Sequence, residues 1–126
     1  MTSSPEAMKG RTKSFALGVI RLIQGLPEDR VSGRLGDQLL RAATSVGANY
    51  RAACRARSRA EFRSRLGIVE EEADESMYWM ELLLEAGFVP HERCDKLIRE
   101  ANEIVSIVVA SIKTSALGER HSSRPK

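Results

Sequence analysis

Histidine and cysteine are scarce in this sequence of 126 residues, which contains two of each. Cys54 and Cys94 lie far apart along the chain, and no CxxC motif or Cys/His cluster accompanies either of them. Two isolated thiols cannot complete the four-ligand set of a structural zinc site. We therefore expect two reduced cysteines and no bound metal or cofactor.

Long apolar runs are missing as well. No stretch approaches the roughly 18 consecutive apolar residues that a membrane-spanning helix requires. The first fifteen residues also lack the apolar segment of a secretory signal. We therefore expect a cytoplasmic protein that has no membrane partner.

Proline occurs four times and aromatic residues make up 5% of the chain, whereas Ala, Leu, Glu and Arg dominate its middle, a composition typical of helices. Apolar residues spaced three and four apart predict helices over residues 14–26, 31–56, 59–86 and 90–116. The connections between them are short and no strand is predicted. We expect one all-α domain, an up-down-up-down four-helix bundle over residues 12–117, with flexible segments at 1–11 and 118–126.

Two local patterns refine these helices. Ser58 and Glu61 fit a capping box that starts the third helix. Gly33, Gly36 and Gly47 inside the second helix indicate close packing or a frayed start there. The apolar stripe of the second helix is expected to contain Leu35, Leu39, Ala42, Ala43, Val46, Tyr50 and Ala53. That of the third is expected to contain Phe62, Leu66, Val69, Ala73, Met77, Met80 and Leu84.

Charge is strongly segregated along the chain. Residues 51–65 carry six arginines and one acid, whereas residues 70–85 carry seven acids and no base. Arginine binds phosphate in a bidentate manner that lysine cannot match. As candidate contacts to nucleic-acid phosphates we select Arg41, Arg51, Arg55, Arg57, Arg59 and Arg63. Two alternatives remain open, namely ion pairing with the acids of a neighbouring subunit, and an ordinary solvated helix face.

The acidic run does not resemble a di-metal site. Bundle di-metal sites require Glu-x-x-His pairs, and the two histidines lie in a predicted loop and in the tail. No Cys/His pair, Ser-His-Asp set, phosphate-binding glycine loop or dinucleotide fingerprint is present. We expect neither a catalytic residue nor a metal ligand, and hence no enzyme.

A second apolar face lies on the third predicted helix, outside its core stripe. It consists of Ile68, Tyr78, Trp79 and Leu82. Tyr and Trp are favoured anchors of protein interfaces, so we expect this face to pack on another subunit. The alternative is a broad core covered by the other helices. Asn49, at the border of the core face, is expected to have a buried structural role, in which its amide bonds a neighbouring helix, rather than to contact a ligand.

The segments SVGANYR (45–51), RARSRAEF (55–62) and EADESMYWMELL (72–83) resemble the four helix bundle protein family that is linked to intervening sequences of bacterial large-subunit ribosomal RNA genes. The resemblance spans about residues 14–113. It implies a left-handed bundle that assembles as a ring-like homopentamer. A similar pentamer in accessory proteins of diversity-generating retroelements binds RNA and a reverse transcriptase through a basic surface. Family members commonly have a Glu where this chain has Ala52-Ala53, so the resemblance implies a more basic surface here.

Two interpretations follow. The first is a non-catalytic, oligomeric protein that binds RNA or DNA through the arginines at the corner between the second and third helices. The second is a protein-interaction scaffold whose arginines pair with the acidic third helix of a neighbouring subunit or with another protein.

Overall fold

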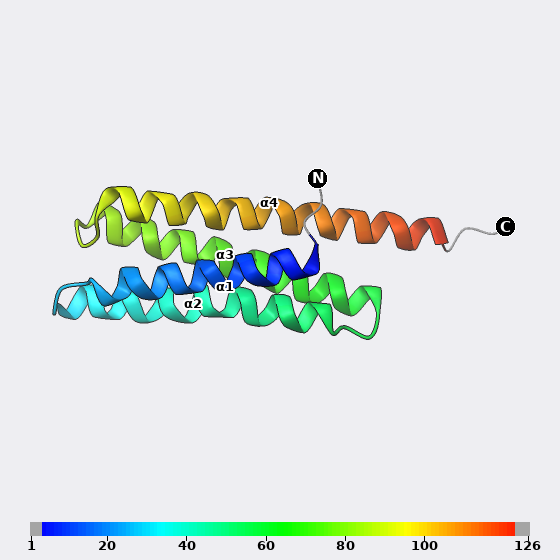
Figure 1. Cartoon of the computed structure of the whole chain (residues 1–126), viewed down its shortest axis with the longest axis horizontal. Helices are drawn as coiled ribbons and strands as arrows, with labels where there is room; N and C mark the ends of the chain where they lie inside the picture. Colours follow the sequence, from blue (N-terminus) through cyan, green and yellow to red (C-terminus); the bar gives the residue numbers. More distant parts are fainter. Residues whose placement is uncertain (1–3, 123–126) are drawn as a thin grey trace.

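The computed structural model describes residues 4–122, and these fold into four α-helices with no strand among them. The helices are α1 (Pro5–Gln24), α2 (Arg30–Cys54), α3 (Arg59–Glu85) and α4 (His91–Ser122). They lie side by side, with the α2–α3 connection at the opposite end of the molecule from the other two (Figure 1). The predicted all-α, four-helix fold is thereby confirmed. In the described part of the chain no helix is both long and apolar enough to cross a membrane.

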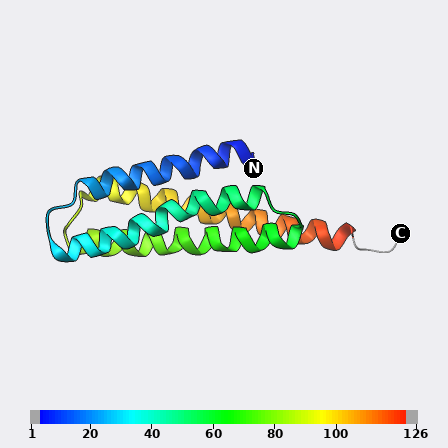
Figure 2. The same cartoon turned by 90° about the horizontal axis from the view of Figure 1, so that it is seen from below.

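The helices pack in a cycle. α2 packs against α1 and α3, and α4 packs closely against α3 but only loosely against α1. α1 consequently lies to one side of the other three helices (Figure 2).

α1 begins nine residues before the expected start at residue 14. The Ser4 hydroxyl accepts a hydrogen bond of 3.1 Å from the backbone N–H of Ala7, and Pro5 occupies the first turn, where its missing N–H costs nothing. Met8 is buried in the core. Thr12 is buried as well, and its hydroxyl donates to the carbonyl oxygen of Met8 at 2.9 Å. A polar residue thus occupies a core position, so apolar spacing alone does not reveal this part of the helix.

Both ends of the bundle therefore differ from expectation. Residues 5–11, predicted to be a flexible segment, are helical, and so are residues 118–122, which were assigned to the C-terminal tail. The remaining residues of the two predicted flexible segments that precede Ser4 or follow Ser122 lie outside the described residues.

The predicted core of α2 is confirmed almost completely, since only Leu35 is half-buried rather than buried. The predicted core of α3 is confirmed only in part. Phe62, Met77 and Leu84 are half-buried rather than buried, whereas Ser76 and Leu83, which were not predicted, are buried. The buried residues of α3 are spaced alternately three and four positions apart. This is the heptad spacing of helices that pack side by side with their axes nearly aligned. Ser76 tolerates burial because its hydroxyl donates to the carbonyl oxygen of Glu72 at 2.8 Å.

Candidate functional site

An arginine-lined groove lies beside the α2–α3 connection, at one end of the bundle. Arg51 reaches it from the last turn of α2, and Arg55 from the C-cap of that helix. Arg57 reaches it from the connection and Arg65 from α3. Its volume is about 670 Å³. Ala48 and Ala52 also line it, and their small side chains leave the space between the guanidinium groups open. We call this feature the arginine groove.

One acid, Glu61, lines the arginine groove, and it has a local structural role. Its carboxylate accepts a hydrogen bond of 2.7 Å from the backbone N–H of Arg57, while the Ser58 hydroxyl accepts one of 3.0 Å from the N–H of Glu61. This confirms the predicted cap of α3, except that Glu61 reaches back to Arg57 rather than to Ser58. The cap fixes the connection that carries Arg57.

A second basic groove lies on the other side of the same arginines. It runs between α1 and α2, has a volume of about 400 Å³ and is lined by Arg51, Arg55, Lys9 and Lys13. Glu6 also lines it and forms an exposed ion pair of 3.3 Å with Lys9. Arg51 and Arg55 thus form a ridge between two grooves. Lys9 and Lys13 were missed from the sequence because α1 was predicted to begin after them.

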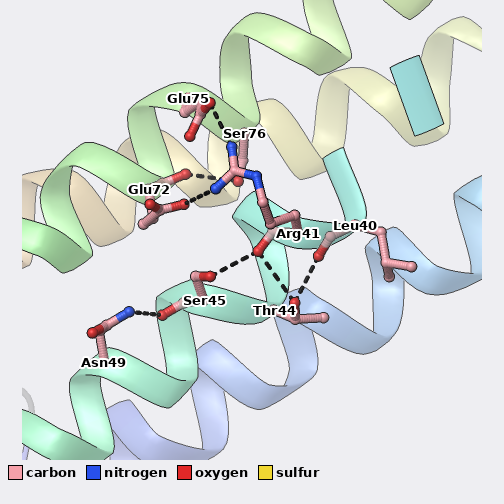
Figure 3. A network of polar contacts seen from close by, with 8 residues as sticks. All are labelled: Leu40, Arg41, Thr44, Ser45, Asn49, Glu72, Glu75 and Ser76. Atoms are coloured by element: carbon pink, nitrogen blue, oxygen red, sulfur yellow. Dashed lines mark hydrogen bonds and ion pairs between the residues drawn. The ribbon is translucent and has the colours of Figure 1, made fainter. Parts of the chain in front are cut away.

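Arg41, predicted to contact phosphate, lies elsewhere. Its guanidinium group donates to Glu75 at 2.6 Å and to Glu72 at 3.3 Å, both on α3 of the same chain (Figure 3). The hydrogen bond to Glu75 raises the pKa of Arg41. Burial raises the pKa of Glu72, and the nearby guanidinium only partly offsets this effect. Arg41 therefore pairs with two carboxylates of its own chain, and it lies outside the arginine groove.

The polar contacts around Arg41 continue along α2. Thr44 and Ser45 donate to carbonyl oxygens one turn earlier in the helix, and the Asn49 amide donates to the Ser45 carbonyl oxygen at 2.9 Å (Figure 3). The expectation that Asn49 bonds to a neighbouring helix is therefore wrong, since its amide bond lies within α2.

Arg59 and Arg63 face α4 rather than the arginine groove. Arg63 donates to the hydroxyl of Ser115 at 3.4 Å. The Arg59 guanidinium lies beside Gly118, so close that a Cβ atom at this glycine would be 3.4 Å from one of its nitrogens. Of the six predicted arginines, Arg51, Arg55 and Arg57 share the groove.

The cysteines, the acidic residues and Tyr50 were also compared for metal-binding groups and shifted pKa values. Among residues 4–122 there is no group of three or more His, Cys, Asp or Glu side chains that could hold a metal ion. Cys94 is buried and donates to the Met80 carbonyl oxygen at 3.4 Å, and burial raises its pKa to about 11. Burial, with the neighbouring Cys54, raises the pKa of Tyr50 to about 12. Both groups therefore remain protonated at neutral pH.

The predicted apolar face of α3 is partly core. Trp79 packs against the core, and its indole nitrogen is buried with no hydrogen-bond partner in the described structure. Ile68 and Leu82 are half-buried. Tyr78 is 53% exposed, with its ring edge-on to Trp79 at a centroid distance of 5.2 Å. Tyr78 is thus the member of this face that is most available to a partner.

Comparison with known proteins shows similarity to a protein family and to solved structures. The family model described as 23S rRNA-intervening sequence protein matches residues 8–110, which include every basic residue that lines the two grooves. A crystal structure from Bacteroides thetaiotaomicron, of a protein with unknown function from the S23 ribosomal protein family, is 32% identical to this chain. That match has a TM-score of 0.80 and covers 86% of this chain and 97% of the other. A search of curated proteins gives no match.

Proposed function

The chain belongs to the 23S rRNA-intervening sequence protein family, and from its grooves we propose that it is a non-catalytic cytoplasmic protein that binds the backbone of RNA or DNA. The observation that carries this proposal is the convergence of Arg51, Arg55, Arg57 and Arg65 on one groove. Each guanidinium can hold a phosphate through two parallel hydrogen bonds.

The charge balance of the arginine groove supports an anionic ligand. Four arginines face one glutamate, and the Glu61 carboxylate is already engaged by the Arg57 backbone. Lys9 and Lys13 extend the basic surface across the Arg51–Arg55 ridge. A polyanion that lies over this ridge meets cations on both sides, and its affinity should depend steeply on salt because bound phosphates release counterions.

We further propose the assembly that the family resemblance implies, an up-down-up-down, left-handed bundle in a ring-like homopentamer. Its contact face would be Ile68, Tyr78, Trp79 and Leu82, of which Tyr78 is the most exposed. A ring repeats the arginine groove in every subunit. Repeated sites on one long polyanion raise its affinity through effective concentration, without any new contact.

The test is titration of labelled RNA and duplex DNA with the protein at low and near-physiological salt. The variant is R51E/R55E, which reverses the ridge. Its matched control is R30E/R34E, which makes the same charge change on exposed residues at the opposite end of α2. We expect R51E/R55E to lose binding and the slope of affinity against salt to flatten, while R30E/R34E keeps most of both.

The scaffold interpretation remains the second candidate, and the exposed Tyr78 beside the acidic run of α3 favours it. Arg41 pairs with that run inside one chain, so the partner would have to bind the other acids. The scaffold interpretation would replace the first proposal if the protein does not bind nucleic acid at low salt and if its assembly depends on Tyr78.

A further inference from the structure

An apolar pocket of about 530 Å³ opens at the same end of the bundle as the arginine groove. Pro5 of α1, Tyr50 and Cys54 of α2, and Phe62 of α3 line it. Tyr50 is nearly buried, whereas Cys54 and Phe62 are half-buried. Its size lies within the range of small-molecule sites, which are commonly apolar and aromatic with a few polar groups.

The pocket lies next to both basic grooves and shares a lining residue with each of them. Arg57 lines the pocket and the arginine groove, and Lys9 lines the pocket and the groove between α1 and α2. A polyanion that lies on the Arg51–Arg55 ridge therefore passes the mouth of an apolar, aromatic-lined hollow. A group that fits this pocket would have flat, apolar faces to pack against the aromatic side chains, and it would be attached to phosphates that the basic grooves can bind.

We propose that this pocket receives an unpaired nucleobase, so that the protein's ligand is single-stranded or looped nucleic acid rather than a regular duplex. This inference rests on the proposed function, which supplies the phosphate contacts. Stacking on aromatic side chains holds unpaired bases in RNA- and DNA-binding proteins. In a duplex both faces of each base are covered by its neighbours, so a duplex can occupy the grooves but not the pocket.

The experiment separates the base from the backbone. The probes are a single-stranded oligonucleotide and an abasic oligonucleotide of equal length and charge, each in ribose and deoxyribose form. We expect the wild-type protein to bind the oligonucleotide with bases about tenfold more tightly than the abasic one, the effect of one stacked base. Comparison of the ribose and deoxyribose oligonucleotides shows whether RNA or DNA binds more tightly.

The variant is Phe62→Ala, and its matched control is Phe88→Ala. Phe88 is also half-buried and packed against the core, but it lies in the α3–α4 connection at the opposite end of the bundle. We expect F62A to lose the tenfold preference while F88A keeps it. A second test needs no substitution, because N-ethylmaleimide should react with half-buried Cys54 and spare buried Cys94. The modified Cys54 should fill the pocket and remove the preference.

The outcomes distinguish the two proposals. If wild-type protein binds both oligonucleotides equally, or if F62A and the modified protein keep the preference, the pocket does not hold a base and the arginine groove stands alone. If neither oligonucleotide nor duplex binds at low salt, the nucleic-acid proposal itself fails. Loss of the preference in F62A and in the modified protein, with salt-dependent backbone binding retained, supports both.

Discussion

The guanidinium group of Arg11 on α1 and the carboxylate of Glu100 on α4 share two hydrogen bonds, of 2.7 and 2.9 Å. The hydrogen bond to Glu100 raises the pKa of Arg11. This pair joins the two neighbouring helices that pack least closely. Because α1 also carries Lys9 and Lys13, the pair helps to hold one wall of the groove between α1 and α2.

A double-mutant cycle measures this coupling. We expect R11M and E100Q each to lower the free energy of unfolding, with a coupling of about 0.5–1 kcal/mol for a partly exposed bidentate pair. Urea denaturation of the four proteins gives the value. The exposed Lys9–Glu6 pair is the control and should couple more weakly. A coupling near zero would mean that apolar packing alone holds α1 against α4.

Glu72 should make stability depend on pH. Burial raises its pKa above the unfolded value, so the folded state binds the proton more tightly. Its contribution is therefore complete below the unfolded pKa, about 4.3, and is lost as pH rises through the folded pKa. We expect E72Q to gain stability relative to wild type as pH rises from 4 to 7 in urea denaturation.

The control for this prediction is E75Q. Glu75 makes the shorter bond to Arg41, 2.6 Å against 3.3 Å for Glu72. E75Q should therefore destabilise the protein at pH 7. Parallel pH profiles for E72Q and wild type would show that the burial of Glu72 has no energetic consequence.

Two glycines should respond differently to substitution by alanine. A Cβ atom at Gly47 would lie 3.2 Å from the Thr12 hydroxyl oxygen, which hydrogen bonds fix to α1, whereas a Cβ atom at Gly67 meets nothing within 4 Å. We expect G67A to stabilise α3 by about 0.5–1 kcal/mol through helix propensity, and G47A to gain less or to destabilise. Thermal unfolding followed by circular dichroism compares them. Equal gains would mean that α1 and α2 separate readily at Thr12.

The fold was predictable because its signals are local. The helix-forming composition, the capping box at Ser58 and the apolar stripe of α2 can each be read from residues a few positions apart along the chain. The start of α1 was not predictable in the same way. Its core position at Thr12 is polar, and burial there depends on a hydrogen bond to Met8 that the helix itself creates.

The site was predictable only in part. Arg51 and Arg55 could be grouped because one helix spaces them by four residues. Arg41 lies on the same face of α2 as these arginines. Its partners Glu72 and Glu75 belong to α3, however, and the spacing of residues within α2 does not predict contacts with another helix. Lys9 meets the grooves through tertiary packing of α1, which also lies outside the reach of local patterns.

Tyr78 provides the clearest test of the proposed assembly. Because it is 53% exposed, Y78E should leave the folded monomer intact while placing a charge in the proposed contact face. Trp79 is less informative, since it packs against the core and a charge there would also destabilise the monomer. Light scattering after size exclusion should give a ring-sized mass for wild type and a monomer mass for Y78E. The control, V31E, changes a similarly exposed apolar residue on α2 and should keep the wild-type mass. A Y78E protein that assembles like wild type would place the contact on another face.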